Sequence, residues 1–335
     1  MRVLAIGILT LAAALPAADP LPPGTRWGLH LDVTALLTGR AGETVRAVAT
    51  RQPHAARLAM VRALTGSDPL TDLRTVTVGG GDRPESTVVV VRGRLDRERL
   101  ETMAMAAMDH RSVPAGNRVI HAWTHDGHPA AGCLAAPDLL VLGGSVEQVL
   151  TTMAALDGGP AADLALPAGW KGSAMLLATA KDPGAMGRGP ESALLRATRG
   201  VSARLREDGD ALALEAVAEA GSEDQARRIQ DGLKGLVALI ALRPPEDMPA
   251  SLAAALAAAQ VERQGASVAA QVRMPLDAAI ALVAERLVAG PRPPDRPGLG
   301  GPGRGPSPDG RGPGPDDRGP SDDRRPPPPP RGEPR

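Results

Sequence analysis

One order of elements occurs twice in this sequence, and it limits the possible folds more than any other feature. Each time, a strand leads into a helix, a hairpin follows, and a second helix closes the stretch. The first stretch starts with a strand at 88–91 and a helix capped by Asp96. The second starts with a strand at 211–218. Such an order is typical of helices packed on antiparallel sheet, so we expect an α+β fold made of two related strand-helix-hairpin-helix units.

Local signals mark the ends of these elements. A serine followed three residues later by a glutamine starts a helix in each stretch, at Ser145 with Gln148 and at Ser222 with Gln225. This pairing is a capping box, in which the two side chains satisfy free backbone N–H groups. Asp126-Gly127 is a strong signal for a two-residue hairpin turn.

Composition shifts divide the chain into five predicted parts. These are a signal peptide at 1–17, a first α+β unit at 24–157, a connecting segment at 158–190, a second α+β unit at 191–290 and a disordered tail at 291–335. The connecting segment is interrupted by Gly and Pro and contains one predicted strand near 173–179.

The first part reads as an export signal. Arg2 is followed by an apolar run at 3–15 and by small residues at 16–18, so cleavage is expected after Ala17. The apolar run is shorter than the ~20 residues that cross a bilayer. We therefore expect a periplasmic or secreted protein that keeps no transmembrane helix after cleavage.

The last part is the Pro/Gly/Arg/Asp-rich tail. It contains 16 Pro, 10 Gly, 9 Arg and 7 acidic residues, with a single Leu. Such a composition cannot bury enough apolar surface to offset chain entropy, which predicts disorder. Its positive and negative charges nearly cancel, so the tail is expected to space or tether rather than to bind a polyanion.

The overall composition excludes some classes of partner. The chain has 38 basic and 38 acidic residues, no Phe, no Tyr and three Trp. With no net positive charge and only the three Trp rings available for base stacking, nucleic acid is not expected as a partner. The core must be aliphatic, and the single Cys133 is expected to be a small buried hydrophobe.

Two strand patterns are informative. Residues 25–33 alternate between apolar side chains and the polar set that includes His30 and Asp32, which predicts a half-buried strand. The strand at 87–91 is apolar on both faces, which predicts a central strand.

Several local features together resemble a known group of sequences. A first strand ends near Asp32, a Gly66-Ser67-Asp68-Pro69 turn precedes Asp72-Leu73, the sequence Val-Val-Arg-Gly-Arg-Leu-Asp follows, and Leu142-Gly143-Gly144-Ser145 precedes a helix. This pattern, over roughly 24–290, resembles uncharacterised exported bacterial proteins of the domain-of-unknown-function type. The resemblance implies export and an α+β body, and it brings no established activity.

The sharpest chemical candidate is a group of histidines. His121, His125 and His128 lie within eight residues around the Asp126-Gly127 turn. His121 and His125 project to the same face of a strand, and His128 would lie across the turn from His125. Imidazoles are good ligands for zinc or copper, so these three residues are a candidate metal site. The alternative is an exposed hairpin with a polar tip, because the spacing matches no familiar zinc pattern.

The other candidates have simpler explanations. Ser145 lies between a strand and a helix as a hydrolase nucleophile would, but the capping box accounts for it. The Gly79-Gly80-Gly81 run leads toward a strand, which favours a hairpin loop over a phosphate loop. The arginines at 92, 94, 97 and 99 alternate with acidic residues, which indicates a charge-balanced helix start, with Arg97 paired to Glu101.

No catalytic constellation or cofactor fingerprint therefore emerges from the sequence. The leading hypothesis is a non-enzymatic, exported cell-envelope protein that acts as a binding or structural module. Its expected partner is an envelope protein or polymer of unknown identity. The alternative is a zinc- or copper-binding protein that uses the His121/His125/His128 hairpin.

Overall fold

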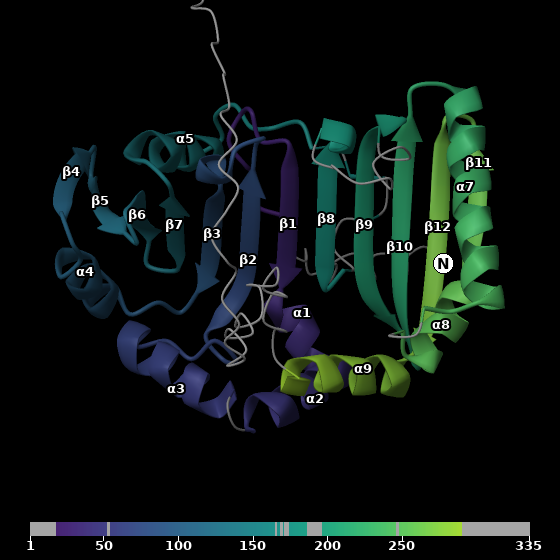
Figure 1. Cartoon of the computed structure of the whole chain (residues 1–335). Coiled ribbons are helices and arrows are strands. Elements are labelled where there is room, and N and C mark those ends of the chain that lie inside the picture. Colours follow the sequence, from purple (N-terminus) through teal and green to yellow (C-terminus); the bar gives the residue numbers. More distant parts are fainter. Residues whose placement is uncertain are drawn as a thin grey trace, which may run out of the picture. The chain divides into compact units, whose positions relative to one another are not determined.

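The structure is a computed structural model that describes residues 18–51, 54–164, 166–167, 170, 174–185, 196–245 and 248–289. Among these residues, twelve strands form one sheet in which each neighbouring pair is antiparallel, as Figure 1 shows. The strand order is β11-β12-β10-β9-β8-β1-β2-β3-β7-β6-β5-β4. This sheet and its helices confirm the predicted α+β class.

The strands have the following bounds: β1 Trp27–Asp32, β2 Leu73–Gly80, β3 Val88–Gly93, β4 Arg111–Ala115, β5 Arg118–His125, β6 His128–Ala136, β7 Leu139–Gly143, β8 Leu176–Lys181, β9 Thr198–Asp208, β10 Ala211–Ala220, β11 Gln260–Gln264 and β12 Ser267–Pro275. The α-helices are α1 Val33–Thr38, α2 Arg40–Ala49, α3 His54–Thr65, α4 Arg97–Met105, α5 Val146–Leu156, α7 Glu223–Leu242, α8 Ala250–Ala257 and α9 Leu276–Ala289.

The repeated order of elements is also visible in the sheet. Outward from the β1–β8 pair, one half runs β1, β2, β3, β7, β6, and the other runs β8, β9, β10, β12, β11. In each half, the third strand outward (β3 or β10) is followed along the chain by a helix (α4 or α7). The same strand pairs in the sheet with the second strand of a hairpin that comes later in the chain, which is β7 in one half and β12 in the other. The β4–β5 hairpin extends the first half only, and the sequence patterns did not reveal β4 or β9.

The predicted connecting segment contributes to the centre of the sheet. Strand β8 comes from it and pairs with β1 on one side and β9 on the other. The two predicted units therefore share one sheet, and the described residues from 18 to 289 belong to one compact unit. The predicted signal peptide at 1–17 and the tail at 291–335 lie outside the described residues.

One face of the sheet is covered in the first half by α5. Val149 and Met153 of α5 pack on Ile120, Cys133 and Val141, all of which are at most 4% exposed. Cys133 is thus the buried hydrophobe that was predicted, and the core here is aliphatic. We call the sheet face to which these strand residues belong the buried face.

Helices also lie against the opposite face, at its two sides. α7 packs Ile229 on Val268 of β12, and α8 and α9 pack around Met274. α4 contacts β5 near the other edge of the sheet, and α2 packs against α9. In Figure 1, α7 lies in front of β11 and β12, while α3, α2 and α9 lie below the strands. Within the described residues, no helix combines the length and the apolar character needed to cross a membrane.

Candidate functional site

Strand β1 alternates as predicted, but its polar side chains are the ones that are buried. His30 is 5% exposed, whereas its neighbour Leu29 is 37% exposed. The paired strand β2 shows the same inversion, because Thr75 and Thr77 are buried and Val78 is half-exposed. An antiparallel sheet with one solvated face normally buries the apolar set.

The buried polar side chains satisfy one another in part. The Asp19 carboxylate accepts hydrogen bonds from Arg92 Nε at 2.6 Å and from the Thr77 hydroxyl at 3.1 Å. Since Thr77 uses its one proton on Asp19, it accepts from His30 Nδ1 at 2.8 Å, which places the imidazole proton on Nδ1. His30 Nε2 and the Thr75 hydroxyl are buried without a hydrogen-bond partner among the described residues.

The pKa of His30 makes folding stability depend on pH. Burial lowers this pKa below its ordinary value, and the nearby charges of Asp19 and Asp32 only partly oppose the effect. The native state therefore binds fewer protons than the unfolded state at mildly acidic pH. The stabilising contribution is complete above pH ~6.5 and is lost as the pH falls below that value toward the folded pKa.

We expect urea unfolding to show that the free energy of unfolding of the unaltered protein falls between pH 7.5 and pH 5. The same measurement on His30→Gln should show a smaller fall. His125→Gln provides the matched control, because the His125 side chain is 77% exposed. Parallel pH profiles for the unaltered protein and His30→Gln would contradict the assignment.

The opposite face presents a continuous apolar surface across seven strands, β7, β3, β2, β1, β8, β9 and β10. Residues paired across neighbouring strands point to the same face, so the pairings define two adjacent rows. The first row is Leu142, Val89, Val78, Leu29, Ala178, Ala203 and Ala216, and the second is Leu140, Val91, Val76, Leu31, Leu176, Leu205 and Leu214. We call these two rows the open face.

All fourteen side chains of the open face are apolar, and none is buried. Leu29 and Leu214 are the most exposed, at 37% and 41%, and the others are half-exposed. The predicted central position of the strand at 87–91 is confirmed by β3, but only its Val88 and Val90 side is buried. Contiguous apolar patches that remain accessible are typical of interaction sites, so the open face is the candidate site.

Helices beside the open face also expose large apolar side chains. On α4, Met103 and Met105 are exposed, and Met108 just beyond it is 71% exposed. On α7, Leu236, Leu239 and Leu242 are exposed. Helix α3 buries none of its side chains and exposes Met60, Val61 and Leu64. These side chains enlarge the apolar surface beside the open face, and the flexible methionines of α4 can adapt their shape to varied apolar ligands.

The three histidines of the predicted metal site lie on the β5–β6 hairpin. His125 and His128 are cross-strand partners beside the Asp126-Gly127 turn, as predicted, and are exposed. His121 instead contacts His110, with Nδ1 and Nε2 3.0 Å apart and the rings stacked. Burial and the charge of His110 lower the pKa of His121. The described residues contain no group of three His, Cys, Asp or Glu side chains that could hold a metal ion.

The simpler explanations of the other candidates agree with the structure. The Ser145 hydroxyl accepts from the Gln148 backbone N–H at 3.2 Å, and Gln148 Oε1 accepts from Gly144, which caps α5. β2 and β3 form the expected antiparallel hairpin, but Gly79 and Gly80 belong to β2, so the loop begins only at Gly81. A Cβ at Gly79 would lie 2.4 Å from Leu21, so close packing explains this glycine.

The four arginines in and before α4 are paired, and the predicted pair of Arg97 with Glu101 is among them. Arg92 pairs with Asp19, Arg94 with Asp72, Arg97 with Glu101 and Arg99 with Asp96. Hydrogen bonds from the Asp68 backbone and from Arg94 lower the pKa of Asp72, although burial opposes them. This cluster is therefore neutralised within the described residues and offers no excess positive charge to a polyanion.

Comparison with known proteins gave limited similarity. No family model and no curated protein matches the chain. Among solved structures, crystal form III of TP0453 is similar with a TM-score of 0.49 and 10% sequence identity, covering 81% of this chain and 99% of that one. Crystal forms IV and I of TP0453 give TM-scores of 0.47 and 0.44 with 9% and 10% identity, each covering 80% of this chain and 97% and 98% of the other.

Proposed function

We propose that this chain is a non-enzymatic, exported envelope protein that binds an extended apolar chain of the lipid type on the open face. The observation that carries this proposal is the inverted alternation of β1 and β2. Here the sequence places His, Asp and Thr inside the protein and Leu and Val outside. Burying Leu and Val and exposing His, Asp and Thr would be the more stable arrangement, unless a ligand covers the apolar side.

The dimensions of the open face support an elongated ligand. Neighbouring strands lie about 4.8 Å apart, so the rows from β7 to β10 run for about 29 Å. The hydrocarbon core of a bilayer, about 30 Å thick, holds two layers of acyl chains. One acyl chain extended along a row would thus fit, and each buried CH2 group contributes about 0.8 kcal/mol.

A lipid also suits the surroundings of the face better than a second copy of the chain. The described helices α4 and α7 pack on opposite sides of it, and both expose large apolar residues. These helices would obstruct a second sheet from packing face to face, whereas a thin flexible chain can lie between them. The export signal predicted at 1–17 would bring the protein to the envelope, where lipids are abundant.

Fluorescence titration with cis-parinaric acid tests this proposal, with palmitic acid as the competitor. We expect saturable binding by the unaltered protein and at least tenfold weaker binding by the double variant Leu29→Gln/Val78→Gln, because two amides would interrupt the first row. The matched control is Leu150→Gln on α5, since Leu150 is 42% exposed but belongs to a helix on the buried face. This control should bind like the unaltered protein.

Three outcomes would overturn the proposal. The first is the absence of saturable binding by the unaltered protein, and the second is equal binding by the double variant. The third is a concentration-dependent dimer in light scattering that Leu29→Gln/Val78→Gln abolishes, which would assign the open face to a second copy of the chain. Circular dichroism of both variants shows whether they retain the fold.

A further inference from the structure

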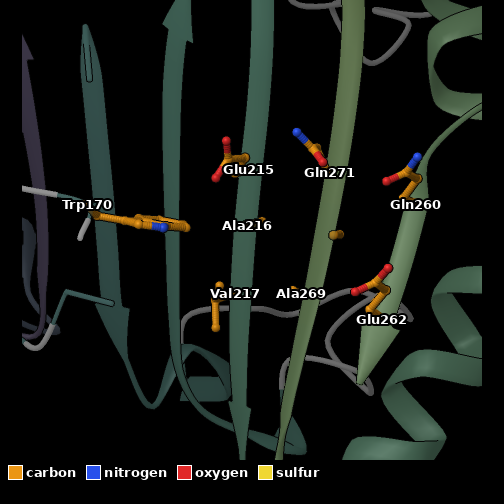
Figure 2. Close-up of a pocket in the computed structure, with 9 residues that line it drawn as sticks. Trp170, Glu215, Ala216, Val217, Gln260, Glu262, Ala269 and Gln271 are labelled. Atoms are coloured by element: carbon orange, nitrogen blue, oxygen red, sulfur yellow. The ribbon is translucent and has the colours of Figure 1, made fainter. Parts of the chain in front are cut away.

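A hollow lies on the buried-face side of the sheet, over β10, β12 and β11, where α5 does not cover the strands. Figure 2 shows Glu215, Gln271, Gln260 and Glu262 projecting from these strands, with Trp170 at one side. Its volume is about 350 Å³, which lies within the range of small-molecule sites. The other lining residues are Val217 and Ala269, on the same side as Glu215, and Ala216 and Ala270, which alternate to the other side and belong to the strands beneath the hollow.

The polar side chains of this hollow form an ordered array. Glu215 pairs with Gln271 across β10 and β12, and Gln271 pairs with Gln260 across β12 and β11. The three side chains therefore follow one line at the strand spacing of about 4.8 Å. Glu262 lies two residues from Gln260 on the same side of β11, beside the small side chain of Ala269.

Glu215 is held rigidly at one end of the array. Its Oε2 accepts from Arg204 Nε at 3.0 Å and Nη2 at 2.7 Å, and its Oε1 accepts from Arg206 Nε at 3.0 Å. Arg204 also lies over the Trp170 ring, 4.9 Å from its centroid. Burial alone would raise the pKa of Glu215, but the hydrogen bonds and charges of both arginines lower it. The carboxylate is thus ionised and preorganised at neutral pH.

The chemistry of the lining indicates the class of ligand. Carboxamides both donate and accept hydrogen bonds, and ionised carboxylates accept several. Hydroxyl groups do both as well, so a ligand with closely spaced hydroxyls matches the line of Glu215, Gln271 and Gln260. Within the described lining there is no Lys or Arg to attract an anion. Val217 and Ala269 provide an apolar surface on which C–H groups of the ligand can pack.

We propose that this hollow binds a neutral saccharide. This site lies on the opposite side of the sheet from the open face, so it does not depend on lipid binding there. The purified full chain should be titrated with maltotriose, cellotriose and triacetylchitotriose by isothermal calorimetry. We expect at least one of these trisaccharides to bind saturably.

Variants within strand β11 provide the decisive comparison. Gln260→Ala and Glu262→Ala should each weaken saccharide binding by about tenfold, because each removes a hydrogen-bonding group from the hollow. Gln264→Ala is the matched control, since Gln264 is an exposed residue of the same strand outside the hollow. All three variants should bind cis-parinaric acid like the unaltered protein.

Failure of all three trisaccharides to bind at millimolar concentration would overturn this assignment. Equal loss of saccharide binding in Gln264→Ala would also overturn it, because the effect would then not arise in the hollow. Neither result would affect the acyl-chain titration, so failure of one proposal is distinguishable from failure of the other.

Discussion

Replacing Glu215 with Ala should lower the free energy of unfolding by about 3 kcal/mol. The carboxylate neutralises Arg204 and Arg206, whose side chains are 13% and 25% exposed. Removing one partner of a buried ion pair leaves charge that water cannot reach well, and such changes cost about 3–5 kcal/mol. We take the lower end because Arg206 keeps a second partner in Asp208 and Arg204 keeps its contact with the Trp170 ring. Urea denaturation at pH 7 measures the difference.

A matched control lies four residues further along β10. Glu219 is exposed, so Glu219→Ala should change the free energy of unfolding by less than about 0.5 kcal/mol. The lowered pKa of Glu215 adds a pH dependence with a defined sign. Its contribution is complete above the ordinary glutamate pKa of ~4.3 and is lost as the pH falls through the folded value. Equal stability of the two alanine variants would show that the ion pairs contribute nothing.

Replacing Gly42 with Ala should also be strongly destabilising, by about 3 kcal/mol. A Cβ at this position of α2 would lie 2.4 Å from the carbonyl oxygen of Leu37 and 2.5 Å from its Cα. These are backbone atoms, so relief requires the corner between α1 and α2 to move, and overpacking of this kind costs 1–3 kcal/mol or more. Leu37 is 5% exposed, which leaves little room for that movement. Thermal and urea unfolding measure the loss.

Gly235 provides the opposite case within a helix. It is an exposed residue of α7, and a Cβ there would have no atom within 4 Å. Gly235→Ala should therefore raise the free energy of unfolding by up to ~1 kcal/mol, because alanine favours the helix more than glycine. If Gly235→Ala also lowered the free energy of unfolding, the loss in Gly42→Ala could not be assigned to the close contact with Leu37.

Much of the local structure follows from short stretches of sequence. Asp96, Ser145 and Ser222 each cap the helix that was predicted to follow them. Asp126 and Gly127 both have positive φ, as a two-residue hairpin turn of this composition requires. The repeated order of elements was likewise readable, because each element depends mainly on residues near it in the chain.

The candidate site could not be predicted in the same way. Alternation in β1 indicates that one side of the strand is buried, and the usual preference selects the side of Leu29 rather than that of His30. The structure shows the reverse, because His30 hydrogen-bonds to Thr77 of the neighbouring strand, and Thr77 in turn donates to Asp19. Similarly, no spacing rule indicated that His121 would contact His110 rather than approach His125.

The sequence by itself determined most of the helices and strands, the caps of three helices and the α+β class, since these depend on propensities and periodicities over a few residues. Only the tertiary structure decided that β8 joins β1 at the centre of the sheet and that Leu29 faces outward. The reason is physical. Shifting a strand by one residue exchanges its two faces, so the choice depends on the burial and hydrogen bonding of the whole sheet rather than on any local stretch.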